Sequence, residues 1–235
     1  MQQILAFITD PTNAFGAETL ATLRLSIVPI ILALIVGIPL GIGLAQRPVA
    51  AFIAANTSGL ARAIPTLAVL AAVVPYLGVG FNPSVFALSL LGIPPILLNT
   101  ITGLRGIDPA TVEAARGMGM TRWQILQRVQ LPLMAPVLAA GVRTSAVQIV
   151  ASVPLAALIG GGGYGDYILL GINLLQTTPL LVGGIGIAAL ALLTEFLLAQ
   201  AQRALTPAGL RVAAASEEEA ATGAMEEPEN ASIAA

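Results

Sequence analysis

The sequence predicts an all-α fold, a polytopic bundle of about five transmembrane helices, with six as the alternative. Hydrophobic residues make up 57 % of the 235 residues and charged residues only 9 %, against about 25 % in ordinary soluble domains. The mean hydropathy is +0.90. Together these values exclude an ordinary soluble enzyme and, for the bulk of the chain, a disordered protein.

Two residue types with strong chemistry are missing, because the sequence contains neither cysteine nor histidine. This absence excludes disulfides, thiol catalysis, Cys/His metal sites and imidazole acid–base chemistry. The sequence also contains no nucleotide-binding P-loop. We therefore expect no metal site, no catalytic residue and no ATP hydrolysis by this chain.

Five apolar runs account for the expected membrane helices. The first, at 25–45, carries no charge and would be about 31 Å long at 1.5 Å per residue, one bilayer core. The later runs cover about 63–77, 83–101, 133–159 and 179–199. A more broken segment at 48–61 predicts either an interfacial helix or a tilted partner of the second run.

Arginines set the expected orientation. Eight of the ten fall in alternate connections that share one side of the membrane, whereas Asp10, Glu18 and Asp166 fall on the other side. These eight are Arg47, Arg62, Arg105, Arg116, Arg122, Arg128, Arg203 and Arg211. Because basic residues stay in the cytoplasm, we expect the amino terminus outside and the carboxyl terminus inside.

Three regions follow from this pattern. Residues 1–24 form an outer amino-terminal segment, and 25–205 form the transmembrane domain. Residues 206–235 are expected to be a disordered acidic cytoplasmic tail, because the last 24 positions carry six glutamates and no base.

The largest cytoplasmic loop before the tail, about 104–132, predicts two short helices. Asp108 is a natural N-cap with Pro109 at the first helical position, and the helix should end at Gly117 or Gly119. A second helix should begin with the capping-box pair Thr121 and Gln124 and end where Pro132 stops it. Its apolar face comprises Ile125, Leu126 and Val129.

Within this loop, Glu113-Ala114-Ala115, Gly119, Val129 and Leu131-Pro132 follow one another at a defined spacing. The pattern resembles the EAA loop of permeases from binding-protein-dependent ABC importers. Around it, IPPILLNTITGLRGIDPATVEAARGMGMTRWQIL, LPLMAPVLAAGVRTSAV and AALIGGGGYGDYI are similar to the glycine betaine/carnitine/choline (osmoprotectant) branch. The likeness covers roughly residues 20–205.

This resemblance implies a mechanism in a bacterial cytoplasmic (inner) membrane. Two permease chains, identical or different, form a pore for solutes such as glycine betaine, choline, carnitine and proline betaine. Two separate ATPase subunits, which hold the ATP and Mg²⁺, each clasp one EAA loop, and an extracytoplasmic binding protein delivers the solute. The residues expected to couple to the ATPase are Glu113, Ala114, Ala115, Gly119, Trp123, Ile125, Leu126, Leu131 and Pro132.

The resemblance implies no cofactor in this chain and no nucleic-acid partner. A permease for methionine or another amino acid is the alternative within the same class. A membrane scaffold that transports nothing is the alternative of another class, but it leaves the EAA spacing unexplained.

Two charges interrupt the last apolar runs, Arg143 in the fourth and Glu195 in the fifth. A lone charge at that depth is expensive, so each should have a partner. We expect an Arg143–Glu195 ion pair that holds the two helices in register. The alternative is that Glu195 faces the pore and attracts a cationic solute.

Four consecutive glycines, at 160–163, follow the fourth run on the expected outer side. They do not match a phosphate-binding loop, because no lysine follows them. We expect either a flexible outer loop, or an outer gate or binding-protein contact. The residues of that second alternative are Gly161, Gly162, Gly163, Tyr164 and Asp166.

Aromatic residues near the same side predict either an interfacial belt or a cage for a quaternary ammonium group. We expect such a cage in the separate binding protein instead. The aromatic residues concerned are Tyr76, Phe81, Phe86, Tyr164 and Tyr167.

Overall fold

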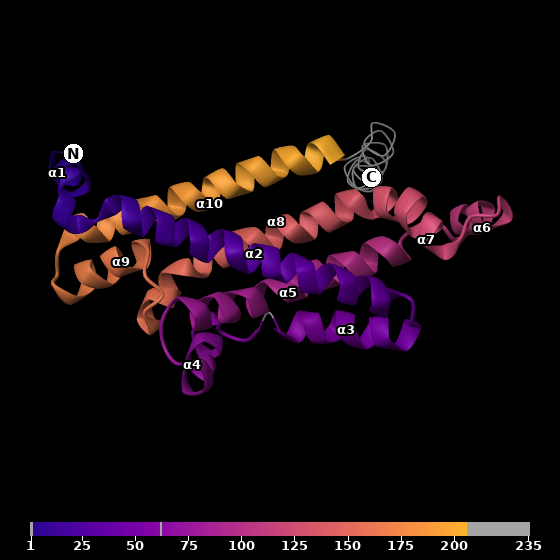
Figure 1. Ribbon diagram of the computed structural model, residues 1–235, viewed down its shortest axis with the longest axis horizontal. Coiled ribbons are helices and arrows are strands. Elements are labelled where there is room, and N and C mark those ends of the chain that lie inside the picture. The colour runs from indigo at the N-terminus through magenta and orange to yellow at the C-terminus, as the bar shows by residue number, and fades with distance from the viewer. Residues whose placement is uncertain (1, 62, 206–235) are drawn as a thin grey trace, which may run out of the picture.

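The computed structural model describes residues 2–61 and 63–205, and within these residues the regular structure is entirely helical. Four long helices lie side by side and give the molecule an elongated shape (Figure 1). They are α2 (Phe15–Ala45), α5 (Phe81–Arg105), α8 (Leu131–Ala156) and α10 (Thr177–Leu205). The expected acidic tail, 206–235, lies outside the described residues.

These long helices confirm the predicted class of fold. In the described part of the chain, four helical stretches are long and apolar enough to cross a membrane. Those stretches are Pro11–Ala45, Phe81–Arg105, Arg122–Ile159 and Thr177–Ala204. They contain the first, third, fourth and fifth runs expected from the sequence.

The second expected run, at about 63–77, holds one helix, α4 (Thr66–Leu77), which is shorter than a membrane span. The broken segment before it forms a separate helix, α3 (Pro48–Ala61), and both helices pack against α5. At 12 residues, α4 is about 18 Å long and too short for a bilayer core of about 30 Å. The break falls before Pro65, because a residue that precedes proline disfavours the helical conformation.

The first membrane helix begins at Phe15, ten residues earlier than the sequence predicted. The sequence prediction starts this helix too late because Glu18 and Arg24 are charged and do not belong to the apolar run. The side chain of Glu18 accepts a hydrogen bond from the Gly163 backbone, so this charge is accommodated within the helical stretch. Before it lie α1 (Gln2–Thr9) and the short 3-10 helix η1 (Pro11–Asn13).

The core forms where α2, α5 and α8 cross. A Cβ atom built on Gly92 of α5 would lie 2.6 Å from Ile149 Cδ1 of α8 and 3.1 Å from Ala33 Cβ of α2. The Gly92 carbonyl accepts a hydrogen bond of 2.8 Å from Ser145 Oγ. A residue without a side chain therefore allows these three backbones to approach closely.

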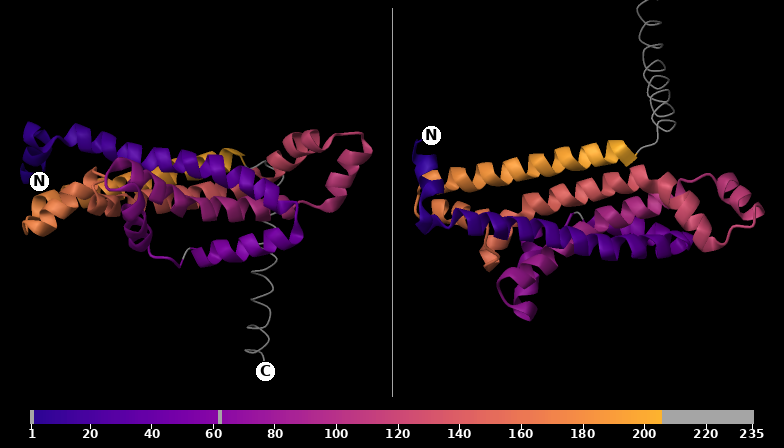
Figure 2. Two further views of the ribbon diagram at one scale, coloured as in Figure 1. Left: turned by 60° about the horizontal axis from the view of Figure 1, so that its bottom comes forward. Right: turned by 45° about the horizontal axis from the view of Figure 1, so that its top comes forward.

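Opposite ends of the bundle carry different short elements. At one end, α6 (Pro109–Gly117) and α7 (Arg122–Ile125) project beyond the other helices in both views of Figure 2. At the other end lie α1, the short 3-10 helix η3 (Ala157–Ile159) and α9 (Tyr164–Asn173) (Figure 1). The α6–α7 end thus also receives Arg47 and Arg105, at the ends of α2 and α5, whereas Asp10 and Asp166 lie at the α9 end.

Candidate functional site

Local residues determine where the projecting helix α6 begins and where the chain turns after it. Asp108 Oδ1 accepts a hydrogen bond of 2.8 Å from the Ala110 N–H, which satisfies one of the free donors at the helix start. The helix ends at Gly117, and Gly119 then adopts a φ of 80°, in the left-handed region that favours glycine. This glycine therefore permits the tight turn that folds α7 back from α6.

The expected capping box opens α7. Thr121 Oγ1 accepts a hydrogen bond of 3.3 Å from the Gln124 N–H. In return, Gln124 Oε1 accepts one of 2.8 Å from the Thr121 N–H. The start of the second helix is thereby capped by residues of its own segment.

The expected end of this second helix at Pro132 is wrong. The chain passes from α7 through one π-helical segment, η2 (Leu126–Gln130), directly into α8, and Pro132 lies in the first turn of α8. A proline ring inside a helix clashes with the carbonyl four residues earlier, here Arg128, and the wider π turn relieves that crowding. The projecting segment is therefore continuous with a membrane helix.

The three consecutive residues Glu113, Ala114 and Ala115 differ in their exposure to solvent. Glu113 and Ala114 are exposed on α6, whereas Ala115 is only 2 % exposed. The Ala115 carbonyl accepts a hydrogen bond of 3.2 Å from the Met120 N–H. Glu113 is thus available to a partner, while Ala115 packs inside the helix–turn–helix.

The apolar side chains expected to contact the ATPase also differ in exposure. Trp123 is 64 % exposed, whereas Ile125 is 4 % exposed, so Ile125 fixes α7 internally and offers no surface to a partner. Met118 is 76 % exposed at the tip, and the sequence analysis missed it. A large apolar residue between Gly117 and Gly119 was the signal that could have identified it. The remaining coupling residues are half-buried Leu126 and Leu131 and exposed Pro132.

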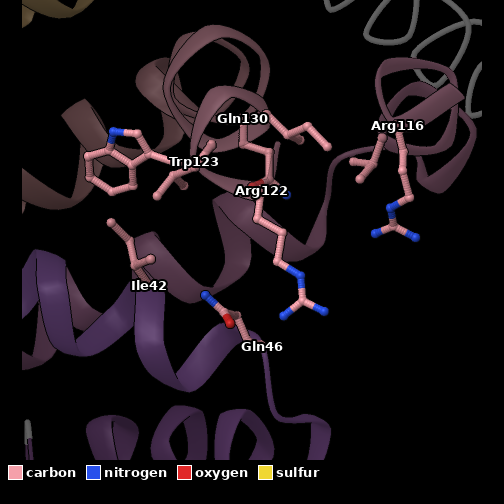
Figure 3. A pocket seen from close by; sticks show the side chains of 9 residues that line it. Ile42, Gln46, Arg116, Arg122, Trp123 and Gln130 are labelled. Atoms are coloured by element: carbon pink, nitrogen blue, oxygen red, sulfur yellow. The ribbon is translucent and has the colours of Figure 1, made fainter. Parts of the chain in front are cut away.

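A cavity of about 620 Å³ lies between the projecting segment and the end of α2. In Figure 3 the Arg122 side chain extends toward Gln46, and the Trp123 ring lies close to Ile42. Arg116 adds a second guanidinium to the wall. The cavity therefore presents an indole face and two cations, a combination suited to an acidic, partly apolar protein segment.

Arg143 and Glu195, which the sequence predicted as partners, form an ion pair between α8 and α10. Arg143 Nε donates a hydrogen bond of 2.7 Å to Glu195 Oε1, and Nη2 donates to the same oxygen. Arg143 Nη1 also donates to Gln202 Oε1 over 3.4 Å. The two charged side chains are 38 % and 35 % exposed, so the pair lies at the surface of the chain.

The glycine-rich turn is tied to the start of α2. The Gly163 N–H donates to Glu18 Oε2 over 2.7 Å, and the Tyr164 N–H donates to Thr22 Oγ1 over 2.8 Å. The Tyr164 hydroxyl lies 2.8 Å from Thr19 Oγ1. The turn is therefore a packed junction between distant segments, which does not favour the expectation of a flexible loop.

The glycines of that turn are largely covered. Gly161, Gly163 and Tyr164 are buried and Gly162 is half-buried, whereas Asp166 is exposed. Partial burial of its carboxyl group nevertheless raises the pKa of Asp166. Of the five residues predicted for an outer gate or contact, Asp166 thus has the most accessible side chain.

Comparison with known proteins identifies the family. The model of the "Binding-protein-dependent transport system inner membrane component" family matches residues 34–207. The chain belongs to that family. It is accordingly an inner-membrane component of a transport system, and the four membrane-length helices agree with that location.

Curated relatives of this permease share most of its length. The glycine betaine/carnitine/choline transport system permease protein OpuCB of Bacillus subtilis is 36 % identical over 90 % of this chain and 97 % of its own. The carnitine transport permease protein OpuCB of Listeria monocytogenes is 38 % identical over 91 % and 98 %. The osmoprotectant import permease protein OsmW of Salmonella typhimurium is 34 % identical over 87 % and 98 %.

A solved structure shares the fold of the permease. An inward-facing form of the MetNI methionine ABC transporter contains a chain that matches with a TM-score of 0.75. The match covers 85 % of the permease and 100 % of that chain at 21 % identity. At this identity the likeness shows the fold alone.

Aromatic rings at the α9 end of the permease pack against one another. Tyr167 meets Phe7 edge-on at 5.2 Å between ring centroids, and Tyr164 stacks on Phe15 at 5.7 Å. Tyr164 and Tyr167 are 8 % and 5 % exposed. Because these rings pack against one another, they form a small hydrophobic core that holds α1 and α9 together.

Proposed function

We propose that this chain is the pore-forming permease of an ATP-driven importer for compatible solutes such as glycine betaine, choline, carnitine and proline betaine. The observation that carries the proposal is full-length likeness to relatives named as permeases for this class of solute, at 36 to 38 % identity over nine-tenths of the chain. In the importer, the α6–α7 end lies in the cytoplasm and a second permease chain completes the pore.

The exposed tip of α6–α7 is the proposed contact with a separate ATPase. Glu113 offers a carboxylate, Trp123 and Met118 offer large apolar side chains, and Gly119 allows the turn. Because α7 continues through η2 into α8, a displacement of the tip moves a membrane helix directly. ATP and Mg²⁺ bind to the ATPase in this proposal, and the permease supplies no catalytic group.

On the outer side, the proposed partner is a soluble binding protein that delivers the solute. The exposed Asp166 and the segment around it offer a contact, while the buried glycines behind it hold the contact in place against α2. The hydrogen bonds that Glu18 and Thr22 accept from the Gly163 and Tyr164 N–H groups link this contact to the first membrane helix.

The experiment is uptake of labelled glycine betaine, choline, carnitine and methionine by cells deleted for the gene and complemented with variants. Glu113→Ala should lower compatible-solute uptake about tenfold or more, because a charge-assisted contact to the ATPase is lost. Thr111→Ala is the matched control, since Thr111 is exposed on the same helix about 200° away from Glu113. Uptake of methionine alone would contradict the proposed solute class, and unchanged uptake in Glu113→Ala would contradict the coupling role.

A further inference from the structure

A polar groove runs between α8 and α10 at membrane depth. It has a volume of about 580 Å³, within the usual range of small-molecule sites, and the Arg143–Glu195 pair forms part of its wall. Arg143 lies 12 residues after the start of α8, about 18 Å along the axis. Thr144, Gln148 and Gln202 add further polar groups to the lining.

The exposure of the Arg143 and Glu195 side chains indicates that the groove does not face lipid. Both charged side chains are more than one-third open in the single chain, and charges at this depth are expensive against lipid tails. On the same helix, Leu193 lies about 200° from Glu195 and is 53 % exposed, as expected of a lipid-facing residue. The groove side of α10 therefore turns away from lipid, toward the inside of the assembled pore.

The hydrogen-bonding capacity of the pair is not exhausted. Both bonds from Arg143 Nε and Nη2 end on the same carboxylate oxygen, Glu195 Oε1. Among the described residues, no hydrogen bond reaches Glu195 Oε2, and three bonds engage only three of the five N–H groups of Arg143. A solute can therefore contact the carboxylate and the guanidinium without first breaking the pair.

We propose that this groove lines the solute path and is a transit subsite for zwitterionic solutes, with Arg143 facing the solute carboxylate and Glu195 its cationic centre. The inference rests on the proposed function and locates the path within it. The eight lining residues include no aromatic side chain, so the groove holds a quaternary ammonium group by charge alone. Such weak contacts suit passage, and the tight selection falls to the binding protein.

The absence of cysteine from the sequence allows a direct test of water access in the assembled importer. Thr144→Cys and Ala151→Cys place single thiols in the groove, and Leu193→Cys is the matched control on the opposite face of α10. The groove thiols should react with a charged methanethiosulfonate about tenfold faster or more than the control, because the reactive thiolate needs a polar surrounding. Equal, slow reaction at all three positions would overturn the proposal and indicate a groove sealed against the second chain.

Exchanging the charges of Arg143 and Glu195 tests whether the groove contacts a zwitterionic solute in the proposed orientation. Wild-type and Arg143→Glu/Glu195→Arg importers, in vesicles with the same ATPase and binding protein, would be compared for glycine betaine and choline uptake. The exchange keeps an ion pair but reverses its polarity, so the ratio of glycine betaine to choline uptake should fall about tenfold. Wild-type uptake with an unchanged ratio would overturn the proposal and leave the pair a purely structural contact.

These outcomes separate the two proposals. If the wild type imported none of the compatible solutes, the proposed function would fail, yet the labelling rates would still report whether the groove is part of a water-filled path. If the exchanged pair did not assemble, the labelling of Thr144→Cys and Ala151→Cys, which retain the native charges, would decide the matter. Arg24→Gln, another arginine change in a membrane helix away from the groove, should leave the solute ratio unchanged.

Discussion

Replacing Gly163 with alanine tests whether the glycine-rich turn is a packed junction. Gly163 has a φ of 83°, and a Cβ atom at this position would lie 2.7 Å from Thr22 Oγ1 and 3.2 Å from the Thr22 backbone nitrogen. With a ψ of −165°, this backbone conformation is one that almost only glycine adopts, and it costs an alanine about 1–3 kcal/mol. Overpacking against α2 costs about 1–3 kcal/mol more. The free energy of unfolding should therefore fall by about 2–6 kcal/mol.

Gly162→Ala is the matched control for this substitution. Gly162 has nearly the same φ, 82°, but its Cβ would meet nothing closer than 4.0 Å. It should therefore lose only the conformational part, about 1–3 kcal/mol. The difference between the two variants isolates the close approach of the turn to α2.

The assay is equilibrium unfolding of the purified permease in detergent micelles, titrated with sodium dodecyl sulfate and followed by circular dichroism. The midpoint of Gly163→Ala should lie well below that of Gly162→Ala, which should lie below that of the wild type. Equal midpoints for the two variants would refute the packed junction and favour a loop that adapts freely.

Three further changes should have local effects. Thr121→Ala removes one bond of the capping box and should weaken α7 by about 0.5–2 kcal/mol, measurable as faster hydrogen exchange of its amides. Gly92→Ala should destabilise the fold by about 1–3 kcal/mol in the detergent titration, because the helix crossing has no room for a methyl group. Burial, reinforced by nearby negative charge, raises the pKa of Tyr167 to about 12, so its contribution to stability should persist below about pH 10 and be lost as the pH rises through 12. In the Tyr76→Phe/Tyr164→Phe variant, phenolate absorbance at 295 nm should therefore rise near pH 12, and a rise near pH 10 would contradict the burial.

Local rules were sufficient for the projecting helix pair. Caps depend on a few neighbouring residues, and Asp108, Thr121 and Gln124 form the hydrogen bonds that their spacing predicted. The pairing of Arg143 with Glu195 followed from the cost of single charges in a membrane. These features could be predicted from the sequence because a single effect, helix capping or the cost of a lone charge in a membrane, decides each of them.

Other features depended on contacts that no local pattern contains. Pro132 is tolerated because a π turn forms before it, and the α2 boundary at Phe15 depends on a bond from Gly163 to Glu18, 145 residues apart. The burial of Ile125, expected to be exposed, likewise results from tertiary packing. Hydropathy extended the second run back to residue 63 because it measures polarity and not the break before Pro65.

In the proposed function, the α6–α7 tip couples ATP hydrolysis to the import of a compatible solute. The most direct measurement is ATP hydrolysis by the importer in vesicles, with and without glycine betaine-loaded binding protein on the outer side, for the wild type and for Glu113→Ala/Gly119→Leu. Loaded binding protein should stimulate hydrolysis and uptake together in the wild type, and the double variant should lose both while remaining in the membrane. Stimulated hydrolysis and uptake at wild-type levels in the double variant would show that the tip does not provide this coupling.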